Sequence, residues 1–276
     1  MLLAGCSVLR LAYPQVPTLA YWWLDGYVDF NDSQAPRVRE QLDELFRWHR
    51  SNQLPDYVAL LARAQAEVQA DATAARMCAW FDELAARLDA AYGHALPAAA
   101  EIALTLTPAQ IDAMERKFAK GNEEFRADYL QATPASRLKA AVKRSVERAE
   151  SLYGRLDEAQ RERIAREVAA SPFDPDLWQA ERLQRQRDIL QTLRRLQADR
   201  ASPEQAQAAL GALAEQARHS PREAHRAYQQ RLLQANCAVA ALVHNGTTPA
   251  QRQVAAATFK GWETDLRALA TPAAAK

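Results

Sequence analysis

Apolar side chains along most of the chain recur every three or four residues, which is the period of an amphipathic helix. One such stripe is formed by Ile111, Met114, Phe118, Gly121, Phe125 and Tyr129. Similar stripes predict helices over residues 35–52, 55–69, 73–92, 134–153 and 175–199. Because runs of β-branched residues are almost absent, the pattern predicts an all-α fold.

Short capping sequences mark where several of these helices begin. A hydroxyl residue, a proline and then a Gln or Glu three residues after the hydroxyl occur at Thr107, Ser202, Ser220 and Thr248. The hydroxyl can accept a backbone N–H while the longer side chain reaches back, and proline gives up an N–H that would have no partner. Further starts are predicted at Thr133, Asp157 and Asp174. Starts and stripes together predict an antiparallel bundle of about ten helices joined by short turns.

Composition limits the functions that this fold can serve. With 276 residues, 49% of them hydrophobic, the chain can bury a sizeable core as one helical domain or as two packed lobes. The 35 Lys and Arg residues nearly balance the 34 Asp and Glu residues, so the charge pattern argues against a nucleic-acid partner. No apolar stretch approaches the roughly 20 residues of a membrane span.

The first residues predict a lipid anchor. Leu3-Ala4-Gly5-Cys6 resembles the bacterial lipoprotein signal, a form of secretory signal peptide in which the cysteine is lipidated and becomes the new N-terminus. The residue after Cys6 is Ser7 rather than an aspartate. In lipoproteins of this kind, that difference implies sorting to the outer membrane. We therefore expect a tether over residues 1–17, a helical domain over 18–270 and a disordered tail over 271–276. The alternative is a cytosolic chain with an ordinary buried Cys6.

Two cysteines remain if Cys6 carries lipid. In an oxidising compartment Cys78 and Cys237 would form an intramolecular disulfide, which we favour slightly. The alternative is that the two thiols pack separately as small apolar side chains on two helix faces.

No cofactor or metal site is predicted. The five histidines are scattered, and no pair has the four-residue helical spacing of a zinc site. Asp25, Asp29 and Asp32 form the densest acidic cluster and could bind calcium, but their spacing does not match an EF-hand loop. We favour the interpretation that Asp29 or Asp32 caps a helix or pairs with a cation such as Arg37.

Aromatic residues crowd the segment after the predicted anchor. Trp22, Trp23 and Tyr27 could dock the protein at lipid headgroups or bind a partner. Because apolar residues surround this helix on nearly all sides, we favour burial in the bundle core. The chain also has no nucleophile elbow, phosphate-binding glycine loop or dinucleotide fingerprint, so we expect no enzyme activity.

Several segments carry a resemblance to a known family. The chain resembles a family of exported proteobacterial lipoproteins of unknown function over nearly its whole length. The segments are LAYPQVPTLAYWWLDGYVDF, WHRSNQLPDYVALL, LYGRLDEAQ, SPFDPDLW and TTPAQRQVAAATFKGWETDLRAL. A weaker resemblance, at LTPAQ (106–110) and LDEAQ (156–160), is to the periplasmic Spy/CpxP chaperones. Capping alone also explains that shorter pattern.

These observations support three hypotheses of function. The first is a lipid-anchored protein facing the periplasm that binds or scaffolds an envelope protein. The second is a Spy-like holdase, which would use an exposed face of apolar and basic residues on the helices after Pro134 and Pro175. The third is an envelope hydrolase with an unrecognised site, which a polar pocket holding a carboxylate or histidine of perturbed pKa would favour.

Overall fold

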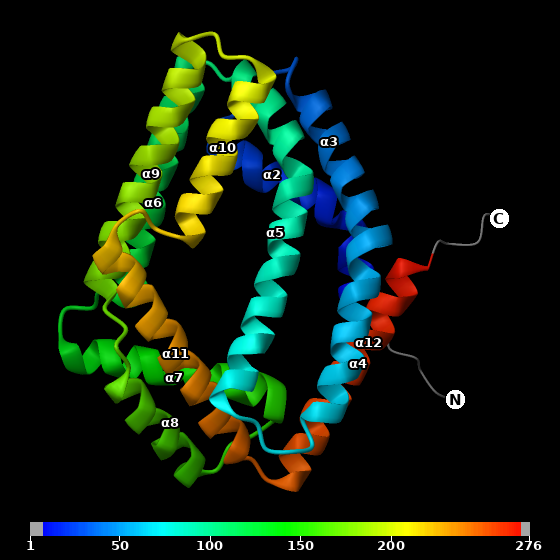
Figure 1. The fold of residues 1–276 in the computed structure, drawn as a ribbon, viewed down its shortest axis with the longest axis vertical. Coiled ribbons are helices and arrows are strands. Elements are labelled where there is room, and N and C mark those ends of the chain that lie inside the picture. Colours follow the sequence, from blue (N-terminus) through cyan, green and yellow to red (C-terminus); the bar gives the residue numbers. More distant parts are fainter. Residues whose placement is uncertain (1–7, 272–276) are drawn as a thin grey trace. The chain divides into compact units, whose positions relative to one another are not determined.

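A computed structural model describes residues 8–271 of the chain (Figure 1). Within this range the chain forms helices and the turns between them, with no β-strand. The predicted all-α fold is therefore confirmed.

The helices follow one another with short connections. The α-helices are α1 (Val8–Ala12), α2 (Val16–Val28), α3 (Ala35–Trp48), α4 (Leu54–Glu67), α5 (Ala74–Thr105), α6 (Pro108–Tyr129), α7 (Pro134–Tyr153), α8 (Glu158–Ala170), α9 (Pro175–Ala198), α10 (Pro203–Arg218), α11 (Glu223–Asn245) and α12 (Pro249–Ala270). A 3-10 turn, η1 (Tyr13–Gln15), joins α1 to α2, and a π turn, η2 (His49–Gln53), joins α3 to α4. Counted as continuous stretches, the described residues form ten helical segments, as expected.

Most predicted capping sequences form. At the start of α6 the Thr107 hydroxyl accepts the backbone N–H of Gln110, and the Gln110 side chain accepts the N–H of Thr107 at 2.9 Å. The same reciprocal pair occurs at Thr133, Asp157, Ser202 and Thr248. The prediction at Ser220 is wrong. Its hydroxyl accepts the N–H of Arg222 in a turn, and α11 begins only at Glu223.

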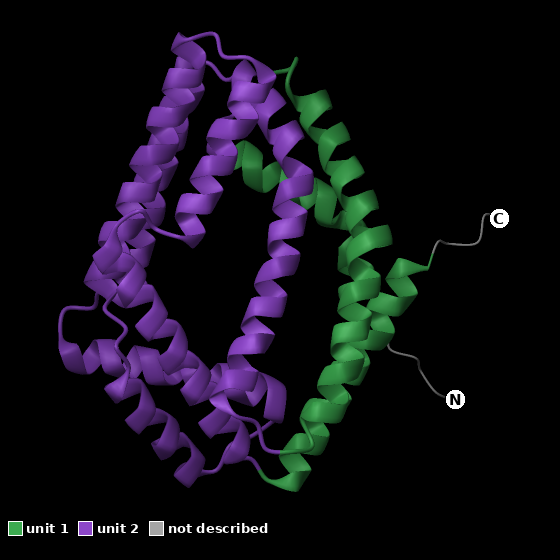
Figure 2. Ribbon diagram, in the orientation of Figure 1, with its two compact units in different colours: residues 1–26, 30–70, 248–276 green, residues 27–29, 71–247 purple. Residues whose placement is uncertain are grey.

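The chain divides into two compact units (Figure 2). Among the described residues, unit 1 comprises 8–26, 30–70 and 248–271, and unit 2 comprises 27–29 and 71–247. Unit 1 is thus built from two segments that lie far apart in the sequence, and unit 2 is essentially one continuous segment.

Unit 1 is organised around α4 and α12, which run antiparallel. Its buried apolar side chains include Val38, Leu54, Leu60 and Ala255. Residues 8–17, which the sequence assigns to the tether, are helical in the structure, and Tyr13 among them is buried. The Tyr13 hydroxyl lies 2.8 Å from Nδ1 of His49, which attaches this segment to η2.

A buried carboxylate on α12 accepts hydrogen bonds from several side chains of unit 1. Glu263 accepts hydrogen bonds from Lys260 at 2.6 Å, Gln65 at 3.0 Å and Arg267 at 2.5 Å. These hydrogen bonds outweigh burial and lower the pKa of Glu263 from 4.5 to about 2. The carboxylate therefore links α12 to α4 in its ionised form.

We expect Glu263 to make unit 1 sensitive to acid. Because its folded pKa lies below the unfolded value, its contribution to stability is fully present above about pH 4.5 and is lost as the pH falls toward 2. Urea unfolding followed by circular dichroism should show wild-type stability falling across this window, with a smaller fall in Glu263→Gln. The exposed Glu40→Gln on α3 is the matched control. Identical pH profiles for wild type and Glu263→Gln would contradict the prediction.

Unit 2 is organised around α5, which packs against α10 and α11. The helix runs well past the predicted end at residue 92 and continues through Pro97. The alanines beyond this proline explain the extension, because Ala100 is completely buried in a cluster with Leu196 and Ala206. Tertiary packing there outweighs the helix-breaking tendency of proline.

The disulfide prediction is confirmed. Cys78 on α5 is bonded to Cys237 on α11, with the two Cα atoms 5.3 Å apart and a sequence separation of 159. Cys237 is completely buried. The bridge therefore fixes the beginning of α5 to the second half of α11 inside unit 2.

Candidate binding cavity

Unit 2 contains a cavity of about 350 Å³ between α5, α9, α10 and the turn that leads into α11. Its apolar wall includes Ala99, Ile189, Leu210, Leu213 and Ala214. Its polar residues are Tyr92, Glu181, Arg185, Asp188, Gln216 and Arg222. The volume lies in the range of about 300 to 1,000 Å³ that is typical of small-molecule sites.

The pairing of α5 with α10 positions this cavity. Small residues, Ala100 and Ala206, bring the helices together at one end. Toward the other end the Tyr92 hydroxyl donates to the carbonyl of Leu210 at 2.9 Å, and Asp89 pairs with Arg218 at 2.5 Å. Longer side chains therefore hold the helices where the cavity opens.

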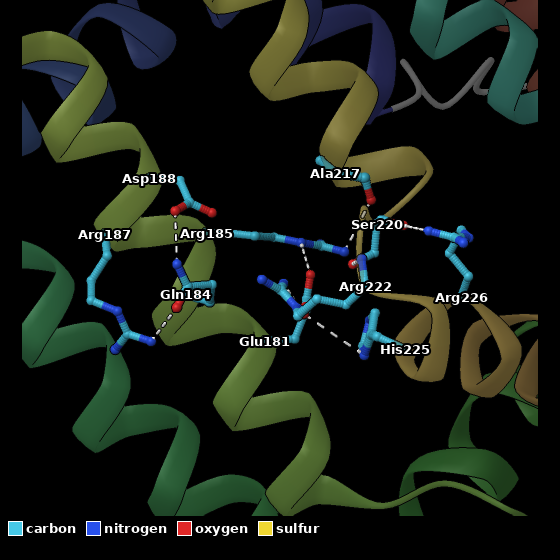
Figure 3. A network of polar contacts seen from close by, with 10 residues as sticks. All are labelled: Glu181, Gln184, Arg185, Arg187, Asp188, Ala217, Ser220, Arg222, His225 and Arg226. Atoms are coloured by element: carbon cyan, nitrogen blue, oxygen red, sulfur yellow. Dashed lines mark hydrogen bonds and ion pairs between the residues drawn. The ribbon is translucent and has the colours of Figure 1, made fainter. Parts of the chain in front are cut away.

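One end of the cavity carries a buried ionic cluster, drawn in Figure 3. Glu181 on α9 is only 7% exposed. One of its carboxylate oxygens accepts from Nε of Arg185 at 3.2 Å, and the other accepts from Arg222 and lies 3.8 Å from Nδ1 of His225. Arg185 also donates to the carbonyl of Ala217 at 3.0 Å. We call these four side chains, Glu181, Arg185, Arg222 and His225, the Glu181 cluster.

The cluster sets the charge at this end of the cavity. Burial raises the pKa of Glu181, but the Arg222 hydrogen bond and the charges of His225, Arg222 and Arg185 together bring it below its ordinary value. Burial lowers the pKa of His225, and the positive charges of the two arginines lower it further, while Glu181 opposes the shift. At neutral pH the carboxylate is therefore ionised and the imidazole neutral, which leaves one net positive charge.

The polar side chains of the cavity include groups of both charges. The residues that line the cavity offer two carboxylates, two guanidinium groups, a tyrosine hydroxyl and a glutamine amide, and no serine, threonine or cysteine nucleophile. The ionised Glu181 is held by two arginines and is a poor general acid. What remains is an apolar chamber with a fixed cationic end.

The acidic residues singled out in the sequence do not assemble into an ion site. The described residues contain no group of three or more His, Cys, Asp or Glu side chains that could hold a metal ion. Asp25 accepts the backbone N–H of Phe30 at 2.9 Å. Asp29 adopts a left-handed backbone, with φ 56°, and its carbonyl accepts from Gln110 at 2.9 Å.

The aromatic segment is only partly buried, so the favoured core interpretation is wrong for both tryptophans. Trp22 and Trp23 are 60% and 62% exposed. Tyr21 is buried under Arg39, whose guanidinium lies 3.5 Å from the ring centroid, and the half-buried Tyr27 packs 5.9 Å from Phe118. The inward face of α2 is used by Tyr21, so the two residues that follow it point outward. Docking of Trp22, Trp23 and Tyr27 at a membrane or partner stays a prediction.

We expect truncation of these tryptophans to have little effect on stability. Trp22→Ala or Trp23→Ala should lower the free energy of unfolding by less than about 1 kcal/mol, because surface substitutions remove few packed contacts. Leu54→Ala, at a fully buried position of the same unit, should cost about 2 to 5 kcal/mol. Urea denaturation measures all three. A loss above 3 kcal/mol for either tryptophan would show that it is packed in solution.

The predicted lipidation site, Cys6, lies outside the described residues. So do residues 272–276 of the predicted tail. None of the described helices has both the length and the apolar composition required to cross a membrane.

Fold and cavity together define an all-helical protein that encloses a ligand-sized, largely apolar site with a buried ionic end. The chain belongs to a family of unknown function, DUF6279, which matches residues 26–219. The match covers more than half of the chain and includes Glu181 and Arg185, and it confirms the resemblance to a family of unknown function. No curated protein and no solved structure matches the chain.

Proposed function

We propose that the protein is a non-enzymatic binding protein of the bacterial cell envelope, anchored through Cys6 to the outer membrane and facing the periplasm. Its binding site is the cavity of unit 2, and the observation that carries this proposal is the apolar chamber closed at one end by the Glu181 cluster. The Cys78–Cys237 disulfide supports the location, because such bonds persist in oxidising compartments such as the periplasm.

The cost of burying the Glu181 cluster supports a binding role. Placing the carboxylate of Glu181 beside an apolar wall carries a desolvation penalty, which the partly exposed guanidinium groups of Arg185 and Arg222 share in part. Such groups, gathered at a cavity, are the usual mark of a ligand site. The cluster therefore makes the cavity a better candidate site than an accidental packing defect.

The cavity is tested with a neutral apolar dye, N-phenyl-1-naphthylamine. We expect its fluorescence to rise on addition of the purified protein. Leu213→Trp, which fills the chamber, should abolish the rise, whereas Trp262→Leu, at an exposed position of unit 1, should not. If the dye does not bind, or if Leu213→Trp leaves its binding unchanged, the cavity is not the binding site.

The anchor has its own test. In a full-length gene, Cys6→Ala should move the protein from the outer-membrane fraction to the soluble fraction, because lipid supplies the membrane attachment. The double variant Cys78→Ala/Cys237→Ala keeps Cys6 and should stay with the membrane. Immunoblots of fractionated cells measure both. Continued membrane retention of Cys6→Ala would defeat the anchor.

Two other functions are weaker proposals. A Spy-like holdase would need exposed basic residues among apolar ones, but Arg182, Arg185 and Arg194 of α9 are engaged by Asn122, Glu181 and the pair Asp112 and Glu115. Suppression of the aggregation of an unfolding client at a near-stoichiometric ratio would favour it. The lowered pKa values of Glu181 and His225 favour a hydrolase, but no serine, threonine or cysteine lines the cavity beside them.

A further inference from the structure

An apolar stripe on α5 extends from the cavity. Phe81, Leu84, Leu88 and Tyr92 are 43%, 42%, 67% and 39% exposed. Their spacing of three, four and four residues places them on one face of the helix. Tyr92 also lines the cavity, so the stripe and the chamber share a boundary.

The end of α10 explains why this stripe is uncovered within unit 2. The two helices run antiparallel, with Ala100 beside Ala206 and Asp89 paired with Arg218. Because Arg218 is the last residue of α10, the part of α5 that precedes Asp89 extends beyond α10 and has α11 as its other neighbour. Nearer its beginning, α5 is attached to α11 by the disulfide between Cys78 and Cys237. Apolar surface therefore continues from the chamber for about two helical turns.

The turn that follows α10 offers further hydrogen-bond donors at the cavity. Arg222 donates one guanidinium N–H to Glu181, and its side chain is 42% exposed. Its remaining guanidinium nitrogens bond to no described residue. Asp188, the other carboxylate of the cavity, lies seven residues along α9 from Glu181, about 10 Å away. Asp188 accepts a hydrogen bond from Gln184 at 2.8 Å, so one oxygen of its carboxylate is already engaged on α9.

We propose that the cavity binds a single-chain amphiphile, a long alkyl chain that ends in a carboxylate. The inference rests on the proposed binding function and names its ligand class. The carboxylate lies against Arg222, whose remaining guanidinium nitrogens can donate to it, and near the positive charge of Arg185. The alkyl chain lies along Leu213 and Leu210 and continues over Leu88 toward Phe81.

An alkyl chain fits this surface better than a peptide does. Every residue of an extended peptide brings a backbone N–H and C=O that need partners once they leave water. The middle of the chamber is lined by Ile189, Leu210, Leu213 and Ala214, and the Tyr92 hydroxyl is already engaged by Leu210. A peptide would therefore lose hydrogen bonds there, and an alkyl chain loses none.

The test uses the fluorescent probe 11-(dansylamino)undecanoic acid with the purified chain at pH 7.5. We expect saturable binding that hexadecanoate displaces and that methyl hexadecanoate displaces at least tenfold less well, because the ester carries no charge. Arg222→Gln should weaken probe binding about tenfold or more, which corresponds to the loss of a charge-assisted hydrogen bond. Arg222→Lys should weaken it less, since the charge remains.

Arg187→Gln is the matched control, because Arg187 lies on α9, the helix of Glu181, is exposed and bonds only to Gln184 among the described residues. It should bind the probe as the wild type does. Circular dichroism verifies that each variant is folded. If Arg222→Gln is unfolded, Arg222→Lys and the ester comparison decide the outcome.

The outcomes separate the ligand class from the binding function. If hexadecanoate and its methyl ester displace the probe equally well, the site does not recognise a carboxylate. Unchanged probe binding by Arg222→Gln would likewise overturn this part of the proposal. The wild type could bind N-phenyl-1-naphthylamine, with binding lost in Leu213→Trp, and still fail to bind the dansyl acid. In that case the proposed ligand class is wrong and the cavity remains a binding site. If neither probe binds, both proposals fail.

Discussion

Replacing Cys78 and Cys237 together by alanine is expected to lower the free energy of unfolding by about 4 to 5 kcal/mol on the chain-entropy model. The bridge closes a loop across a sequence separation of 159 residues, so its loss restores many conformations to the unfolded chain. Removal of the buried Cys237 sulfur also leaves a small void against α5. Urea denaturation of the double variant beside the wild type measures the difference.

The control for this prediction is Cys6→Ala, which leaves the bridge intact and should unfold as the wild type does. Mass spectrometry of the unreduced wild-type protein should detect the peptide that links Cys78 to Cys237. Two alkylatable thiols in the unreduced protein would contradict the bridge. A loss of less than about 1 kcal/mol in the double variant would contradict its energetic role.

Glu181→Ala is expected to destabilise unit 2 by about 3 kcal/mol. Removing one partner of a buried ion pair costs roughly 3 to 5 kcal/mol, because the remaining charges lose their compensation. The lower end applies here, since Arg185 and Arg222 are partly exposed and keep some hydration. Glu215→Ala, whose exposed carboxylate pairs with Arg218 and His219, should cost at most about 1 kcal/mol. Equal effects of the two substitutions would show that the Glu181 cluster is not buried in solution.

The same variant has a defined dependence on pH. The folded pKa of Glu181 lies below its ordinary value of 4.5, so its contribution is full above that pH and is lost as the pH falls through the folded value. Because the folded pKa of His225 is also lowered, acid reduces the stability of the folded protein through this residue as well, beginning below about pH 6.5. The gap in stability between wild type and Glu181→Ala should therefore narrow below pH 4.5.

The fold was predictable from sequence because the patterns that specify each helix involve residues close together in the chain. A capping box such as that of Thr107 and Gln110 needs only four consecutive residues, and an apolar period needs only one helix. The prediction at Ser220 was wrong because the turn before α11 is fixed by contacts with α9, including the bond of Arg222 to Glu181. Trp22 and Trp23 were assigned wrongly for a similar reason, since the direction of a helix face depends on what packs against it.

The candidate site was not predictable in the same way. The sequence presents Arg185 as one cation of a basic helix and His225 as one of five scattered histidines. Arg222 stands 41 residues after Glu181, and only the antiparallel return of α10 brings them together. The spacing of four residues between Glu181 and Arg185, on a helix whose other face is apolar, was the available signal. The disulfide could be proposed because few cysteines leave few pairings.

The interleaved order of the two units has a consequence for how the chain matures. A polypeptide that emerges from its first residue onward presents α4 long before α12, the helix that packs along it in unit 1. All of unit 2, including the second cysteine at residue 237, becomes available in the meantime. Unit 2 can thus fold and form its disulfide first, while the face of α4 that packs against α12 is still uncovered. The two segments of unit 1 meet only after α12 is made, so a nascent chain halted before residue 249 contains the whole of unit 2 and an incomplete unit 1.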